Sequence, residues 1–386
     1  MNRHPRPILP RPRLLPVLAA PLLFAACAPA TIVHAPASAA EPVPVAVEAV
    51  PEAAAPAQPA LLPAVPQPPE RPVAPPSVTD PSISRDQRIA AFVDYTATTY
   101  GVDPAHIRRV LAGAEHKQSI IDAMSRPAEA VRPWRDYRPI FINDARISGG
   151  RAFYAENRAA LDRVAAETGV PAEYIVAIIG VETSYGRITG NHRVLDALYT
   201  LAFGFPRRAP FFAGELAQLF ALAAEEPQLD IPSLKNSYAG AMGMGQFMPS
   251  SYRLWAKDGD GDGRRDLLTH KPDVFASIAN YFVIHGWERG APVVARASRD
   301  AGAEDFRPEG LDPVHPLSAL AGRGYRPMAG QPLADGATLL SFDGADGPEY
   351  WLGYRNFYVI SRYNRSPMYS LAVHQLAQAI AGREPQ

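Results

Sequence analysis

Cysteine and lysine are both scarce in this chain. Its 386 residues include one cysteine, Cys27, and four lysines, and the formal net charge is −1. A single cysteine excludes an intramolecular disulfide framework and a cysteine-based zinc site. A net charge so close to zero argues against a protein that binds nucleic acid through a broad basic surface. We therefore expect no nucleic-acid partner.

The N-terminal residues lack the length to span a membrane but have the features of an export signal. Several arginines precede an apolar run from Leu14 to Ala26, which is shorter than the about 20 residues of a membrane-spanning helix. This pattern predicts a secretory signal peptide at residues 1–27. Cys27 ends the sequence LFAAC and is the predicted lipidation site, although Phe24 stands where Leu, Val or Ile is usual. We expect an exported outer-membrane lipoprotein that faces the periplasm; the alternative is cleavage at an ordinary A-x-A site, which gives a soluble periplasmic protein.

Residues 28–84 have too few apolar side chains to form a core. Fifteen of the 41 prolines lie between Pro29 and Pro81, among Ala, Val and Glu. Such a composition cannot bury enough apolar surface to fold, and proline-rich segments act as semi-rigid spacers. We therefore predict a disordered tether over residues 28–84 and a folded domain over residues 85–386.

Helical spacing dominates the sequence from residue 85 onward. It predicts helices at residues 86–100, 158–168, 171–182, 214–224, 273–285 and 368–380, with Asp103-Pro104 beginning another. After Gly290 the chain changes to short segments rich in Val, Leu and aromatic residues, which predict strands at 292–297, 338–342 and 357–361. The expected fold class is mainly α (α+β), with a small antiparallel β insertion at about 291–356.

The segment PAEYIVAIIGVETSYGR predicts a buried helix that ends in a carboxylate. Residues 174–181 are apolar on nearly every side, and Glu182 follows them directly. Desolvation would raise the pKa of Glu182 and keep it protonated near neutral pH, as a general acid requires. The alternative is a glutamate that reaches solvent or pairs with an arginine.

A second motif, GAMGMGQFMPSSY at residues 240–252, combines glycines with polar and aromatic side chains. The glycines allow the backbone to approach another group closely, and the rings offer flat faces suited to sugars. A phosphate-binding loop fits poorly, because no Lys-Ser/Thr pair follows the glycines. The alternative is a glycine-rich turn in which methionines fill gaps in the core.

Together with PRRAPFFAGEL and ANYFVIHGW, these motifs resemble lytic murein transglycosylase B, of glycoside hydrolase family 103, from about residue 85 to the C-terminus. The resemblance implies a lysozyme-like catalytic core at about 151–290 and 357–386, behind a helical N-terminal region. It implies a peptidoglycan lytic transglycosylase for cell-wall turnover and remodelling, which cleaves the β-1,4 bond between N-acetylmuramic acid and N-acetylglucosamine and leaves 1,6-anhydro ends. The expected partners are glycan strands, the outer membrane through the lipid anchor, and proteins of cell-wall synthesis.

The resemblance also assigns residues. Glu182 matches the catalytic acid and base, and no cofactor is implied for catalysis. The substrate contacts carried over by motif, with Ser184 as a further candidate beside them, are Tyr137, Ser184, Arg207, Arg208, Gln246, Phe247, Tyr281, Tyr363 and Tyr369. For each tyrosine alone, a place in the core or on the surface is an equal alternative. The family often has Arg-Trp where this chain has Ser184-Tyr185, so contacts there are expected to differ.

The segment DGDGDGRRDLLTHKPD predicts a structural calcium site. Asp258, Asp260 and Asp262 place oxygens at alternate positions before a glycine, as at the start of a calcium loop. A standard EF-hand fails, because Thr269 stands at loop position 12. The resemblance implies that Asp273 closes the site and that the Arg264 carbonyl is a further ligand, in a loop about one residue longer than expected. The alternative is an acidic turn without metal.

Two other functions stay open at this point. A muramidase would hydrolyse the same bond with water, and a non-catalytic lipoprotein would only bind peptidoglycan. Other acids are present, but Asp196 is expected to be a helix cap or ion-pair partner, and Glu225 and Glu226 a solvated helix end.

Overall fold

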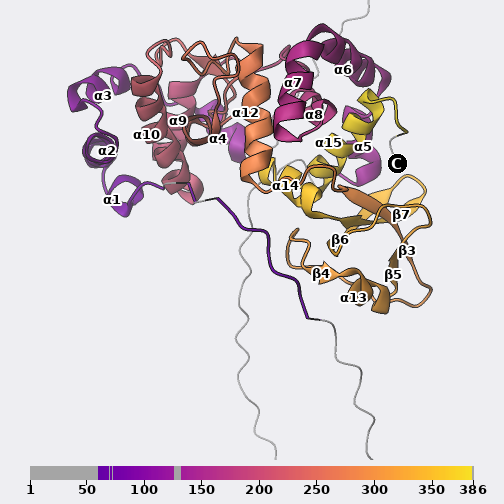
Figure 1. Cartoon of the computed structure of the whole chain (residues 1–386). Coiled ribbons are helices and arrows are strands. Elements are labelled where there is room, and N and C mark those ends of the chain that lie inside the picture. Colours follow the sequence, from indigo (N-terminus) through magenta and orange to yellow (C-terminus); the bar gives the residue numbers. More distant parts are fainter. Residues whose placement is uncertain (1–59, 69, 72, 126–131, 385–386) are drawn as a thin grey trace, which may run out of the picture.

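The structure, a computed structural model, describes residues 60–68, 70–71, 73–125 and 132–384. The predicted signal peptide, Cys27 and the predicted tether up to residue 59 lie outside the described residues. Figure 1 shows two groups of helices on either side of α12 (Lys271–Ile284), with a small sheet beside the second group. The helical regions and the sheet agree with the predicted mainly α (α+β) class.

Helices make up most of the described chain. Besides α12 they are α1 (Pro76–Thr79), α2 (Arg85–Tyr100), α3 (Pro104–Leu111), α4 (Gln118–Ser125), α5 (Trp134–Phe141), α6 (Asp144–Glu156), α7 (Arg158–Thr168), α8 (Ala172–Thr183), α9 (Val194–Gly204), α10 (Ala209–Glu225), α11 (Pro249–Trp255), α13 (Leu317–Gly322), α14 (Arg355–Tyr363), α15 (Pro367–Ile380) and a 3-10 turn, η1 (Pro206–Arg208).

Helix α8 lies in the centre of the second group. Ten of its twelve residues are buried, and it packs against α6, α7, α12 and α15. A helix that is apolar on nearly every side is stable only in such a position. In the first group, α9 and α10 pack against each other, and α2 covers α10.

The strands form two antiparallel sheets. β1 (His192–Arg193) pairs with β2 (Lys235–Asn236). The larger sheet has the order β4-β6-β7-β3-β5. Its strands are β3 (Val294–Arg299), β4 (His315–Pro316), β5 (Tyr325–Pro327), β6 (Gly336–Gly344) and β7 (Gly347–Gly353). Most predicted elements are confirmed within a few residues, but α10 begins five residues before the predicted helix at 214.

The strand predicted at 357–361 is wrong, because these residues form helix α14. Phe357, Val359 and Ile360 are fully buried, so packing outweighs their modest preference for strands. The Asn356 side chain fixes the start of this helix: its Oδ1 accepts from the Glu288 amide at 2.8 Å, and its Nδ2 donates to the Glu288 carbonyl at 2.8 Å.

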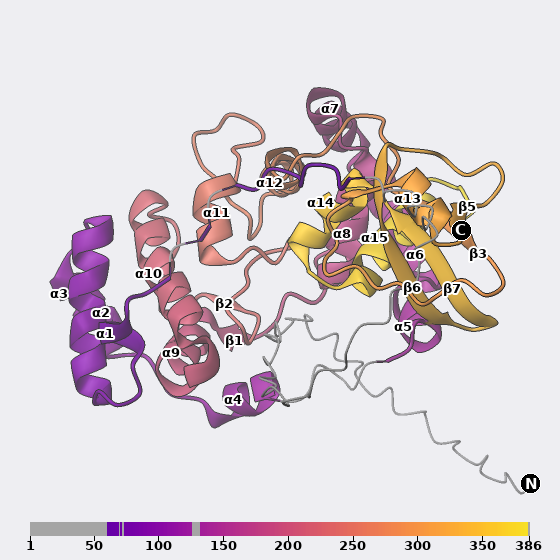
Figure 2. The ribbon, with the colours of Figure 1, turned by 90° about the horizontal axis from the view of Figure 1, so that it is seen from below.

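The predicted disordered tether is wrong for residues 60–68, 70–71 and 73–84, which lie against the folded domain. The amide of Leu62 donates to the Val314 carbonyl at 2.6 Å, and that of Ala74 donates to the Pro210 carbonyl at 3.0 Å. Val65 and Val78 are 6% and 0% exposed. Figures 1 and 2 show this segment running from the larger sheet, across α12 and α11, to α1. Val65, Ala74 and Val78 are buried against surface that the folded domain supplies, whereas Leu61 and Val73 stay exposed; composition alone does not reveal these contacts.

Among the described residues, no single helix is long and apolar enough to cross a membrane; α7 and α8 meet the criterion only as a pair bent by 116°.

Candidate active site

Helix α8 ends directly after Glu182 in an unusual turn. Ser184 and Tyr185 have left-handed backbone angles, with φ of 54° and 65°, which costs about 1–2 kcal/mol for each L-residue. The Tyr185 ring offsets part of this cost, because it packs against Gly180, where a Cβ atom would lie 2.8 Å from the ring. Its hydroxyl also donates to the Arg146 carbonyl at 2.6 Å. The packed turn therefore fixes the position of the Glu182 carboxyl at the end of the buried helix.

Glu182 is partly exposed, so its carboxyl is reachable from solvent although protein surrounds most of it, and Tyr369 is its one polar partner among the described residues. Burial raises its pKa from 4.5 to about 7, and the Tyr369 hydroxyl, which donates to Oε1 at 2.6 Å, opposes this rise. No charged group among the described residues contributes to the shift. At neutral pH a large fraction of Glu182 is therefore protonated, as a general acid requires. The alternative of an arginine partner finds no support in the described chain.

Three of the predicted substrate contacts lie near this carboxyl. Burial, followed by the charge of Glu182, raises the pKa of Tyr137, Tyr363 and Tyr369, so these phenols stay protonated. The Tyr363 hydroxyl donates to the Gly245 carbonyl at 2.5 Å. The Tyr137 hydroxyl is buried and has no hydrogen-bond partner among the described residues. Because buried polar groups are normally paired, Tyr137 has an unused donor and acceptor for a bound ligand.

The glycine-rich loop forms a wall beside the end of α8. The Thr183 hydroxyl donates to the Met244 carbonyl at 2.9 Å. Gln246 has a φ of 53°, and its Nε2 donates to the Gly243 carbonyl at 2.9 Å and to Asn236 Oδ1 at 3.1 Å. Gly243 has a φ of +72°, and a Cβ atom there would overlap the Leu267 carbonyl. The loop is thus held rigidly, with Gln246 at its turn.

Phe247 and Tyr281, which were predicted to contact substrate, are buried in the structure. They are 3% and 4% exposed, and their rings pack against Tyr363 with centroids 5.9 and 4.8 Å away. Both rings therefore pack against the Tyr363 ring and hold it in place. Ser184 is also buried, and its Oγ accepts from Arg187 at 3.0 Å.

The predicted arginine pair lies on η1, directly before α10. Arg207 is exposed, and Arg208 is half-buried. The Arg208 guanidinium lies over the Phe211 and Phe212 rings, 4.5 and 4.9 Å from their centroids. These rings hold Arg208 without neutralising it.

The other acids considered from the sequence have partners of their own. Asp196 accepts from the Glu115 amide at 2.9 Å and lies 3.6 Å from Arg193, as predicted. Glu215 accepts from the amide and hydroxyl of Ser250 at 2.9 and 2.6 Å. Neither acid is among the groups that shift the pKa of Glu182.

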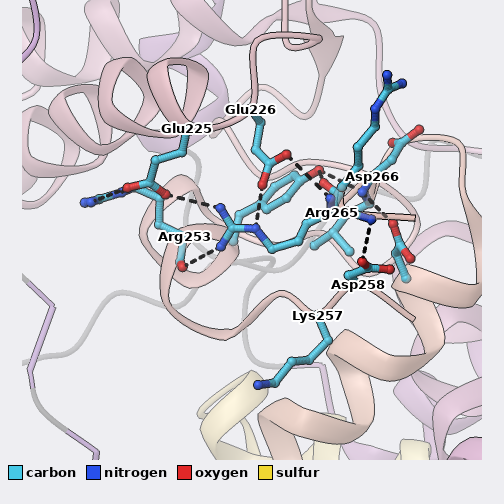
Figure 3. A network of polar contacts seen from close by, with 12 residues as sticks. Glu225, Glu226, Arg253, Lys257, Asp258, Arg265 and Asp266 are labelled. Atoms are coloured by element: carbon cyan, nitrogen blue, oxygen red, sulfur yellow. Dashed lines mark hydrogen bonds and ion pairs between the residues drawn. The ribbon is translucent and has the colours of Figure 1, made fainter. Parts of the chain in front are cut away.

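The prediction of a solvated helix end holds for Glu225, which is exposed, and is wrong for Glu226, which is buried. Figure 3 shows both side chains in a polar network with Arg253 and Arg265. Glu225 lies 2.6 Å from Arg253 and 3.2 Å from Arg265, and Glu226 lies 2.5 Å from Arg265. Glu226 is only 6% exposed. The network ties the end of α10 to α11 and to Arg265 within the predicted calcium loop, a contact between distant parts of the sequence.

The first part of the predicted calcium loop has the expected form. The carboxylates of Asp258, Asp260 and Asp262 offer oxygens within 4.8 Å of one another. Asp258 also accepts from the amides of Gly261 and Gly263 at 2.6 and 2.8 Å, which curls the loop around it. An all-oxygen set at alternate positions fits a hard cation such as calcium.

Asp273, the predicted closing ligand, has neighbours other than the ones expected. Asp273 accepts from the amides of Gly259 and Asp266 at 2.8 and 2.7 Å, so it braces the loop against α12. It groups with Asp260 and His270 rather than with all three loop aspartates. The amide of Arg264 donates to Asp262 at 2.8 Å.

Two features of these sites were not predicted. The first is His270, which lies 2.9 Å from Asp260. The loop is about one residue longer than expected, and this length was a signal that the spacing of the ligands would change. Arg71, which lies 3.8 Å from Glu215, is in the segment interpreted as a tether. Its composition contains no signal of a contact with the folded domain.

Comparison with known proteins agrees with this geometry. Residues 84–378 match the family described as "Transglycosylase SLT domain". Membrane-bound lytic murein transglycosylase B of Escherichia coli K12 is 42% identical over 301 residues, covering 75% of this chain and 81% of that protein. Soluble lytic transglycosylase SltB1 from Pseudomonas aeruginosa has a TM-score of 0.72 at 48% identity, covering 76% of this chain and 98% of that one. The E. coli lytic transglycosylase Slt35, solved in complex with calcium, has a TM-score of 0.69 at 40% identity, covering 76% and 92%.

The fold, together with a glutamate of raised pKa that has no charged partner among the described residues, defines a lysozyme-like enzyme that cleaves glycosidic bonds. The chain belongs to the SLT-domain transglycosylase family. A further member, SltB3 from P. aeruginosa, is 32% identical, has a TM-score of 0.66 with 77% of this chain and 79% of that one covered, and was solved with NAG-NAM-pentapeptide.

Proposed function

We propose that this transglycosylase cleaves the β-1,4 bond between N-acetylmuramic acid and N-acetylglucosamine in peptidoglycan, using Glu182 alone as acid and base. The observation that carries the proposal is the isolation of Glu182: its pKa is about 7, and no second carboxylate contributes to that value among the described residues. Enzymes that use two carboxylates hold the second one close to the first. The chain is therefore a lytic transglycosylase of the cell wall whose product is a 1,6-anhydro end.

The reaction begins with protonated Glu182. Its proton passes to the glycosidic oxygen, the bond to the anomeric carbon breaks, and the N-acetyl oxygen of the same sugar stabilises the positive charge. Glu182 is now a carboxylate, and the Tyr369 hydroxyl donates to it at 2.6 Å. The carboxylate then takes the proton of the muramic 6-hydroxyl, whose oxygen attacks the anomeric carbon and closes the anhydro ring.

The residues around Glu182 have distinct roles in this proposal. Tyr137 supplies its unpaired hydroxyl to the substrate, and Gln246 and Tyr363 border the reacting sugars. Phe247 and Tyr281 position Tyr363. Exclusion of water by this packed wall favours attack by the 6-hydroxyl over hydrolysis.

The test is digestion of purified peptidoglycan with the full chain and with Glu182→Gln, followed by mass analysis of the products. We expect products lighter by one water than hydrolytic ones, absent with the variant. Reducing ends would identify a hydrolytic muramidase instead. Binding to the sacculus without any product would identify a non-catalytic binding protein.

We also propose that the loop of Asp258, Asp260 and Asp262 binds a structural calcium ion, with Asp273 bracing it. Calcium would screen three carboxylates that lie within 4.8 Å of one another. Adding calcium to chelator-treated protein should raise Tm in a concentration-dependent way. Asp260→Asn should abolish the rise, whereas Asp300→Asn, directly after β3, should not. An equal rise in both variants would contradict this site.

For localisation, we propose export and lipidation at Cys27, with peptidoglycan as the partner and cell-wall synthesis proteins as further candidates. The sequence LFAAC supports this proposal. Metabolic labelling with palmitate should mark the full chain and not Cys27→Ser. An unlabelled wild-type chain would indicate a soluble periplasmic enzyme.

A further inference from the structure

The described residues between 60 and 80 (60–68, 70–71 and 73–80) form a strap that lies outside the residues matched to the family, 84–378. The strap is fixed at both ends: Leu62 donates to Val314 beside the larger sheet, and Ala74 donates to Pro210 at the start of α10. Figure 2 shows it crossing beside α12 and α11 on its way to α1. The strap therefore brings side chains of its own to the middle of the molecule.

Arg71 of the strap lies close to Tyr281, one of the predicted substrate contacts. Its guanidinium is 3.8 Å from Glu215 and 5.4 Å from the centroid of the Trp255 ring. Burial raises the pKa of Tyr281, and the charge of Arg71 and a hydrogen bond from it oppose this rise. Arg71 thus lies between α10, which follows the predicted arginine pair, and a tyrosine that supports Tyr363.

Several arginine side chains lie near Arg71. Burial lowers the pKa of Arg208, Glu215 opposes this effect, and the charges of Arg207, Arg365 and Arg71 lower the pKa further. Arg71 pairs with Glu215, and Arg208 is close enough to interact with Glu215 and with Arg71, Arg207 and Arg365. Glu215 is 2% exposed, whereas the Arg71 side chain is 28% exposed. The carboxylate is buried beneath the arginines, so the surface that faces solvent is cationic.

We propose that Arg71 of the strap is a substrate-binding residue, which together with Arg208 and Arg365 binds the carboxylates of the peptide stem on the glycan strand. This inference rests on the proposed function. N-acetylated sugars carry no charge, and the lactyl carboxyl of muramic acid is consumed in the amide bond to a stem. The anions in such a substrate are therefore those of the stem. Guanidinium groups bind carboxylates through paired, charge-assisted hydrogen bonds.

The competing role for Arg71 is purely structural. In that role it neutralises Glu215, which in turn holds the start of α11 through Ser250. The two roles differ in their dependence on substrate charge. A structural defect would affect every substrate, whereas loss of a stem contact would affect only stems with free carboxylates.

The experiment compares two soluble substrates of equal size. One is a stem-bearing glycan oligomer, and the other is the same oligomer with its stem carboxylates converted to methylamides. The full chain is assayed as wild type, Arg71→Gln and Arg365→Gln, with Arg109→Gln on α3 as a remote control. We expect both Arg71→Gln and Arg365→Gln to raise KM for the free-carboxylate substrate about five- to tenfold, with kcat within about twofold. The methylamide substrate should show no such difference, and the control should match wild type on both.

Arg365→Gln keeps the test independent of folding, because Arg365 is exposed and has no ion-pair partner among the described residues. Equal losses on both substrates in Arg71→Gln, with Arg365→Gln unchanged, would overturn the proposal in favour of the structural role. Unchanged KM in both variants would also overturn it. A wild-type chain that cleaves neither substrate would overturn the proposed function itself.

Discussion

At the residue scale, catalysis and folding stability make opposite demands on Glu182. Catalysis needs a carboxyl with a pKa near neutrality, and burial supplies this by disfavouring the charged form. The same burial costs stability. Because the folded pKa of about 7 exceeds the ordinary 4.5, the folded state should lose stability as pH rises from about 4.5 through about 7.

Glu182→Gln should therefore stabilise the fold at high pH while it removes activity. We expect a free energy of unfolding about 1–3 kcal/mol higher than wild type at pH 8 and nearly equal at pH 4.5. Urea denaturation at the two pH values measures this difference. Glu156→Gln, at an exposed position on α6, should show no such pH dependence. An equal effect of Glu182→Gln at both pH values would contradict the raised pKa.

Tyr369 tunes this carboxyl and gives a second prediction. Its hydroxyl donates to Glu182 and favours the charged form, which lowers the pKa that burial has raised. In Tyr369→Phe the pKa of Glu182 should rise further, so the decline of kcat/KM on the alkaline side should move to higher pH. Tyr174→Phe is the control, because its hydroxyl contacts His374 instead. A profile that loses amplitude without moving would mean that Tyr369 only binds substrate.

At the element scale, the sequence predicted what depends on local pattern. α7 has the predicted bounds, and α8 differs by one residue at each end, because the apolar spacing of α7 and the continuous apolar run of α8 are clear and a glycine or a proline marks one limit of each. α14 was missed, since its aromatic and β-branched residues become helical only through burial between the sheet and the core. The site divides in the same way. The role of Glu182 could be predicted from the apolar helix that precedes it. The burial of Phe247 and Tyr281 could not, because it depends on contacts between distant segments.

The ion-pair network at the end of α10 is a contact of that second kind and allows a third prediction. Glu226→Ala would leave Arg265, which is 24% exposed, without its nearest carboxylate. We expect a loss of about 2 kcal/mol in the free energy of unfolding. The control is Asp94→Ala, whose partner Arg108 is 61% exposed and 3.9 Å away, and which should cost at most about 0.5 kcal/mol. Equal losses in urea denaturation would show that the network adds nothing beyond a surface pair.

At the scale of the whole molecule, the folded unit is larger than the residues matched to the family. The strap buries Val65, Ala74 and Val78 against the domain. Composition could not predict this, because a proline-rich segment gains its apolar contacts from surfaces formed elsewhere in the chain. A chain that begins at residue 84 would expose those surfaces to water.

We therefore expect a chain of residues 84–386 to be less stable than one of residues 60–386 by about 1–3 kcal/mol, the net of buried apolar area and the entropy of ordering the strap. Urea denaturation compares the two. Within the longer chain, Val78→Asp should reproduce most of the loss, because Val78 is fully buried, whereas Val73→Asp should be neutral, because Val73 is 59% exposed. If the two chains were equally stable, or if both valine variants behaved alike, the strap would lie on the domain without stabilising it, and Arg71 would lose the fixed position from which it reaches Glu215.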